Sequence, residues 1–196
     1  MKKLLSLTIL FSFTLAFTQS KIASHESQIN TAIKAAPEML QEGAKVLGYN
    51  QNGKLITLRE GKNDIICLAD DPKKEGISVS CYSDKLEDYM ARGRELRAQG
   101  KTESEKREIR GKEIDEGKLK MPKEPAAVYV LTATQEDYDL GSGELINSRI
   151  RYVLYKPYMS AKETGLPIKP GAPGMPWLMD PDTHRSHIMI SPAPAK

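Results

Sequence analysis

The chain has 196 residues, of which 39% are hydrophobic and 28% are charged, and its formal net charge at pH 7 is +3. A chain of this length ordinarily folds as one domain, with a core large enough that neither metals nor many disulfides are needed for folding. The nearly balanced charge gives no electrostatic argument for a nucleic-acid partner, and no apolar run reaches the roughly 20 residues that a transmembrane helix needs.

The first twenty residues predict an export signal. Lys2 and Lys3 precede an almost wholly apolar run over residues 4–17, and the small residues Thr18 and Ser20 follow it. This order is that of a secretory signal peptide, and the short basic start is typical of a bacterial exporter. We expect cleavage after Ser20, or alternatively after Thr18, which lowers the net charge to +1 by removing the two lysines. The mature protein is then expected to be periplasmic or secreted, in a compartment where disulfides form.

Residues 21–156 are expected to form a single soluble α+β domain that begins with a helix. Ser24 is placed to cap this helix, because a serine hydroxyl accepts a hydrogen bond from a backbone N–H of the first turn. Pro37 should interrupt the helix or open a second short turn.

A β-hairpin is predicted over residues 44–60. Strand-like runs flank Asn52-Gly53, a dipeptide typical of two-residue hairpin turns. With such a turn, Leu47 should face Leu58 across the strands. One face of the sheet is then expected to pack on a helix, while the other stays at least partly wet.

The two cysteines of the chain, Cys67 and Cys81, predict a structural disulfide. Each lies in a strand-like run, and residues 71–75 between the runs contain a turn motif. A second hairpin, continuing the same meander, would place the cysteines opposite each other and close enough to bond. The alternative is a reactive thiol pair, but such pairs usually have Cys-x-x-Cys spacing near the start of a helix.

Residues 84–118 hold ten acidic and ten basic residues and predict a helical region. Thr102 and Glu105 have the spacing of a capping box, which indicates that a helix restarts there. A solvated helix face with i,i+4 ion pairs is the interpretation that the balanced charge favours. The functional alternative is an anion site on three arginines: Arg92, Arg94 and Arg97.

Two more strand candidates follow, at residues 126–134 and 149–156. Together with the four earlier strands they predict an α+β fold. We expect a mostly antiparallel sheet of five or six strands, with two or three helices on one face.

Residues 157–196 differ in composition from the domain, because eight of the twelve prolines fall between Pro157 and Pro194. Proline is excluded from long helices and central strands, so we expect a Pro-rich arm packed on the domain. The cleft between the sheet and this arm is the predicted ligand-binding surface. Its expected site residues are Arg92, Arg94, Arg97, Tyr152, Tyr155 and Trp177.

One segment of the arm could carry chemistry, since residues 180–187 contain two carboxylates and two of the three histidines. Zinc takes imidazole and carboxylate ligands and activates a bound water as a nucleophile. The candidate ligands are Asp180, Asp182, His184 and His187. The alternative is structural: an aspartate caps a turn, a histidine hydrogen-bonds a carbonyl, and residues 188–190 pack as an edge strand.

Two function classes follow from these features. The preferred one is an exported, non-enzymatic module that binds a small ligand or a protein partner without a cofactor. The other is a zinc-dependent hydrolase that uses the segment 180–187. No nucleophile elbow, phosphate-binding loop or dinucleotide motif points to a different enzyme class.

Overall fold

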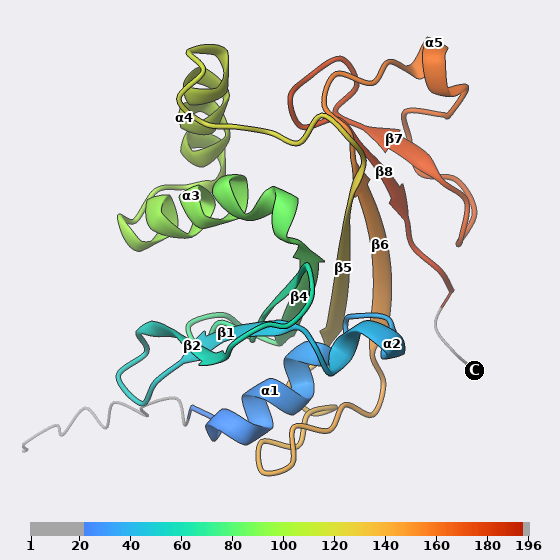
Figure 1. Ribbon diagram of the computed structural model, residues 1–196. Helices are drawn as coiled ribbons and strands as arrows, with labels where there is room; N and C mark the ends of the chain where they lie inside the picture. Colours follow the sequence, from blue (N-terminus) through green and yellow to red (C-terminus); the bar gives the residue numbers. More distant parts are fainter. Residues whose placement is uncertain (1–21, 194–196) are drawn as a thin grey trace, which may run out of the picture.

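The computed structural model describes residues 22–193 and shows an α+β fold (Figure 1). Within this range all strands belong to one eight-stranded sheet. The strands are β1 (Lys45–Tyr49), β2 (Leu55–Arg59), β3 (Ile65–Leu68), β4 (Ile77–Ser83), β5 (Ala126–Ala133), β6 (Arg149–Tyr155), β7 (Trp177–Met179) and β8 (His187–Ile190). The helices are α1 (His25–Ile33), α2 (Glu38–Gln41), α3 (Glu87–Ala98), α4 (Glu103–Asp115) and α5 (Ala161–Thr164), with a 3-10 turn η1 (Asp84–Leu86). The export signal predicted for residues 1–20 lies outside the described residues.

The sheet is mixed but mostly antiparallel, with the strand order β2-β1-β3-β4-β5-β6-β8-β7. Strand β3 does not continue the meander of the first hairpin but crosses over to pair with β1 in parallel. The expected five or six strands are too few, because the Pro-rich arm contributes β7 and β8. The prolines of the arm lie outside these strands rather than within them: Pro176 directly precedes β7, and Pro192 follows β8.

Helices cover both faces of the sheet, which corrects the expectation that they lie on one face (Figure 1). On one face, Ala32 of α1 packs in a core with Val46 and neighbouring strand residues. On the other face, Leu86 of η1 packs with Tyr82, and α3 extends over this second core. Strand β3 shows the same two-sided burial, because Ile65, Ile66 and Cys67 are buried at consecutive positions. Successive side chains of a strand point to opposite faces, so Ile65 and Cys67 enter the first core and Ile66 enters the second.

The first hairpin forms with a different register from the one predicted. Leu47 pairs with Thr57 rather than with Leu58, because Asn50 and Lys54 close a three-residue loop, and only beyond Leu47 does a bulge at Leu58 of β2 restore the predicted register, with Val46 opposite Arg59. The turn is also longer than two residues. The side-chain oxygen of Asn50 accepts two backbone hydrogen bonds across it, each of 3.0 Å, and Gly53 supplies the positive φ of 70°.

The predicted disulfide is confirmed. Cys67 of β3 and Cys81 of β4 are directly paired across the two antiparallel strands, and their sulfur atoms are bonded. Both residues are fully buried in the core beneath α1. The bond therefore ties together two central strands of the sheet.

Two predicted helix caps are also confirmed. The Ser24 hydroxyl accepts a hydrogen bond from the Ser27 N–H at the start of α1. Thr102 and Glu105 form a reciprocal capping box at the start of α4. Between residues 22 and 193 the chain forms no helix with the length and apolar character to cross a membrane.

Candidate anion-binding site

A hollow of about 300 Å³ lies under α3 and α4, against the sheet face that carries the second core. Residues of β3, β4, α3, α4 and the end of β6 line it, together with Arg185 of the β7–β8 connection. Its lining includes one carboxylate, Glu103, and six cationic side chains. These cations are Arg94, Arg97, Lys106, Arg107, Arg110 and Arg185. We call this feature the cationic hollow.

The two helices gather these cations by their spacing. Residues three or four apart lie on one face of a helix, which places Arg94 beside Arg97 on α3 and Lys106 beside Arg110 on α4. Gly93 leaves room for the Arg110 side chain against α3, because a Cβ at this position would lie 2.9 Å from an Arg110 guanidinium nitrogen. A side chain at position 93 would therefore displace the Arg110 guanidinium.

Arg94 forms a closed network at the wall of the cationic hollow. Its guanidinium donates to the Tyr82 hydroxyl and to a Glu87 carboxylate oxygen, both at 2.7 Å. The Tyr82 hydroxyl donates to the other Glu87 oxygen, also at 2.7 Å. Burial raises the pKa of Tyr82, so its hydroxyl stays protonated and holds this arrangement. The Glu87 carboxylate thus neutralises the charge of Arg94, and the network fixes the Arg94 side chain in the wall of the hollow.

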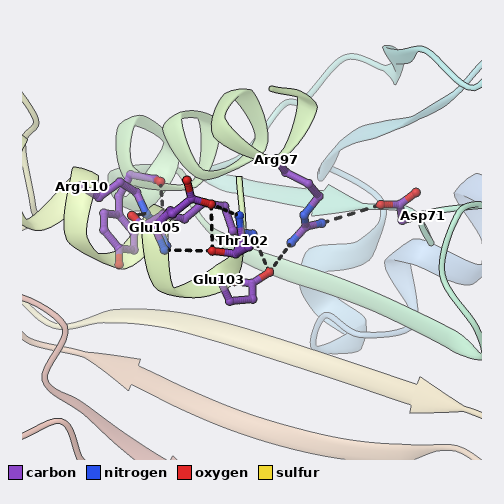
Figure 2. Close-up of polar contacts among 8 residues, drawn as sticks. Asp71, Arg97, Thr102, Glu103, Glu105 and Arg110 are labelled. Carbon is purple, nitrogen blue, oxygen red and sulfur yellow. Dashed lines mark hydrogen bonds and ion pairs between the residues drawn. The ribbon is translucent and has the colours of Figure 1, made fainter. Parts of the chain in front are cut away.

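Arg97 and Lys106 share the single carboxylate of the lining. Figure 2 shows Arg97 between Asp71 and Glu103, at 3.8 Å and 3.7 Å respectively. The Lys106 ammonium is buried and donates to Glu103 at 2.5 Å, and this hydrogen bond lowers the pKa of the Glu103 carboxyl. The ion pairs of Arg97 are therefore long, whereas Glu103 forms a short hydrogen bond with the buried Lys106.

Arg110 is held in the hollow by an aromatic ring and two backbone carbonyls instead of by a carboxylate. Its guanidinium stacks 4.0 Å above the Tyr89 ring and donates to two backbone carbonyls, those of Lys106 and Tyr89, each at 3.2 Å. Burial lowers the pKa of Arg110, and the nearby charge of Arg185 acts in the same direction. None of the ion pairs among the described residues includes Arg110 or Arg107. Two positive charges in the hollow thus lack a carboxylate partner in this part of the chain.

The residues predicted to bind zinc support the wall of the hollow instead of converging on one point. Asp180 lies 2.7 Å from the Arg185 guanidinium, and His187 hydrogen-bonds the Arg185 carbonyl at 2.7 Å. The His187 ring stacks on Tyr155 with the ring centroids 4.8 Å apart. Burial lowers the pKa of His187, so its ring is neutral near neutral pH.

The other two candidate ligands point elsewhere. The ring of His184 meets Tyr89 edge-on, with centroids 6.3 Å apart, and Asp182 is exposed with a φ of 60°. From residue 22 to residue 193, no three His, Cys, Asp or Glu side chains are grouped so that they could hold a metal ion. The zinc-dependent hydrolase therefore remains a prediction from the sequence pattern alone.

The structure divides the predicted ligand-binding residues among several places. Arg94, Arg97 and Tyr155 line the cationic hollow. Trp177 lies in a second hollow, between the sheet and the arm. Tyr152 stacks edge-on against Tyr129 of the first core, so it points to the opposite sheet face.

Arg92 lies outside both hollows. It is held by Glu113 through three hydrogen bonds of 2.6–3.0 Å and by Glu95 through a fourth. Sequence reasoning missed four cations of the hollow: Lys106, Arg107, Arg110 and Arg185. The spacing of the first three on α4 was visible in the sequence, but which face of that helix meets the sheet was not.

Searches of protein-family models, curated proteins and solved structures found no match for this chain.

Proposed function

We propose that this protein is an exported, non-enzymatic binding module that holds an anionic ligand in the cationic hollow. The observation that carries this proposal is the excess positive charge of Arg107 and Arg110 in a partly enclosed site. Neighbouring like charges repel, and the partial burial of Arg110 removes water that would screen its charge. An anion in the hollow relieves this repulsion, and the planar guanidinium fork matches phosphate, sulfate or carboxylate oxygens.

The titratable groups around the hollow support binding rather than catalysis. Burial raises the pKa of Tyr155 to about 12 and also raises the pKa of Tyr89, so both hydroxyls stay protonated at neutral pH. Protonated hydroxyls and arginines are hydrogen-bond donors, which suits an acceptor-rich anion. The two histidines of the arm have pKa values lowered by burial, so neither adds or removes charge near neutral pH.

The disulfide supports the export part of the proposal. A buried bond between Cys67 and Cys81 is compatible with an oxidising compartment such as a bacterial periplasm or the outside of the cell. The signal expected at residues 1–20 supports the same location.

Titration calorimetry with pyrophosphate at low ionic strength tests the binding site. Arg110→Gln should weaken pyrophosphate binding by about 10-fold or more, because a charge-assisted hydrogen bond contributes about 1.5–3 kcal/mol. Arg107→Gln should weaken it less, since Arg107 is more exposed. Lys112→Gln is the matched control: it removes the same charge from α4, but Lys112 is 74% exposed and does not line the hollow.

The expected result is selective weakening by Arg110→Gln and Arg107→Gln, with Lys112→Gln close to wild type. Urea unfolding of each variant checks that the fold is retained. Equal affinities of Arg110→Gln and Lys112→Gln, or no binding of pyrophosphate and sulfate by the wild type, would overturn the proposal.

A further inference from the structure

A second hollow of about 400 Å³ lies between the sheet and the Pro-rich arm. We call it the arm hollow. It combines two arginines of β6, Arg149 and Arg151, with the apolar side chains of Met175 and Trp177. Both arginines are exposed, and the ion pairs found among residues 22–193 include neither of them. The arm hollow is thus a cationic site that also offers apolar surface.

Strand register places both hollows on the same face of the sheet. Ser80 of β4 pairs with Val130 of β5, and Val130 pairs with Arg151 of β6. Directly paired residues point to the same face. Because Ser80 lines the cationic hollow and Arg151 lines the arm hollow, two strand spacings, or about 10 Å, separate their backbones.

The sheet between the two hollows is only partly covered. Ser80 and Val130 are each only half-buried, so no helix covers this part of the face fully. Along β6, Tyr155 of the cationic hollow and Arg151 are four residues apart and point to the same face, which spans about 13 Å. At the end of β6 farthest from the cationic hollow, Arg149 also borders a third hollow. Asp137 lines that hollow and is hydrogen-bonded to Thr134 and Asn147.

We propose that a single anionic glycan chain, carrying sulfate or phosphate groups, occupies the cationic hollow, the open sheet face and the arm hollow together. This inference rests on the proposed function, and it specifies the ligand as chain-like. A single small anion fills only the cationic hollow and leaves Arg149 and Arg151 without a partner. A glycan alternates charged groups with apolar ring faces, and the arm hollow pairs arginines with Trp177 in the same way.

Binding of heparin-derived oligosaccharides of two lengths tests this inference. The wild type should bind an octasaccharide at least 10-fold more tightly than a disaccharide. The double variant Arg149→Gln/Arg151→Gln should lose this advantage of length while keeping its affinity for the disaccharide. Arg110→Gln should weaken the binding of both oligosaccharides, because both use the cationic hollow.

The double variant Lys112→Gln/Lys162→Gln is the matched control, since it removes two exposed charges that line neither hollow. Equal affinity for the two lengths, with Arg110→Gln still weakening both, would overturn the chain-like ligand but leave the proposed function standing. Failure of both oligosaccharides and of pyrophosphate to bind would overturn the proposed function as well. A single-stranded oligonucleotide of equal charge is the last probe. If it binds as tightly as the octasaccharide and with the same dependence on Arg149 and Arg151, the ligand class is not a glycan.

Discussion

The disulfide gives a prediction whose magnitude follows from the structure. Cys67 and Cys81 are 14 positions apart, and a crosslink that closes a loop of about 15 residues stabilises by about 3 kcal/mol in the chain-entropy model. Replacing either cysteine by alanine removes the whole crosslink, together with the packing of one sulfur. Each single variant should therefore lose about 3 kcal/mol plus a smaller packing contribution.

The double variant Cys67→Ala/Cys81→Ala distinguishes the crosslink from packing. Because the crosslink can be lost only once, the double variant should be less destabilised than the sum of the single variants, by about 3 kcal/mol. Urea unfolding under oxidising conditions measures the three free energies. The slope of free energy against urea should also rise in all three, since an uncrosslinked unfolded chain exposes more surface.

A matched packing change serves as the control. Val79 is fully buried on β4, in the same core as the disulfide, so Val79→Ala should destabilise without changing the urea slope. Additive effects of the two cysteine replacements, with a slope equal to that of the wild type, would refute the reasoning. Such a result would mean that no bond restrains the unfolded chain.

Two further predictions concern a half-buried carboxyl and a buried glycine. Burial raises the pKa of Asp70 to about 6, so protonation favours the folded state, and this stabilisation is lost as the pH rises from about 4 through 6. Asp70→Asn retains the acceptor for the Ser78 N–H, and in urea it should match the wild type at pH 4 and exceed its stability at pH 7.5. A difference that is constant with pH would contradict this. Gly143 has a φ of 77°, and a Cβ there would overlap the Ser27 carbonyl oxygen of α1, so Gly143→Ala should destabilise by more than the roughly 1–3 kcal/mol of backbone strain alone. Gly174 has a φ of 83° in open space, so an equal loss of melting temperature in Gly174→Ala would show that the steric overlap has no effect.

Features that depend on near neighbours could be predicted from the sequence. The Ser24 cap, the Thr102 capping box and the pairing of the two cysteines each depend on residues within about 15 positions of each other. Hydrogen-bonding chemistry and a short turn restrict such local arrangements to few alternatives.

Features that depend on tertiary packing could not be predicted. Strand β8 pairs with β6 across more than 30 residues of Pro-rich chain, and nothing local specifies that partner. The cationic hollow also could not be predicted, because residues 84–118 have a balanced charge in the sequence and only packing separates the two signs in space. Glu113 is bound to Arg92 away from the hollow, whereas Arg110 faces into it, and this separation arises only when α4 packs against α3.

The position of β8 between β6 and β7 affects when the proposed binding surface can form during folding. Strand β6 gains its second neighbour only from residues 187–190, and Arg185, which closes the cationic hollow, lies just before them. A chain synthesised only as far as β6 therefore presents an unpaired strand edge, which is prone to aggregation, together with an incomplete hollow. When residues 185–190 pack in place, β8 pairs with the edge of β6 and Arg185 completes the lining of the hollow. The proposed binding site should therefore form in the same folding step that protects this edge from pairing with other chains.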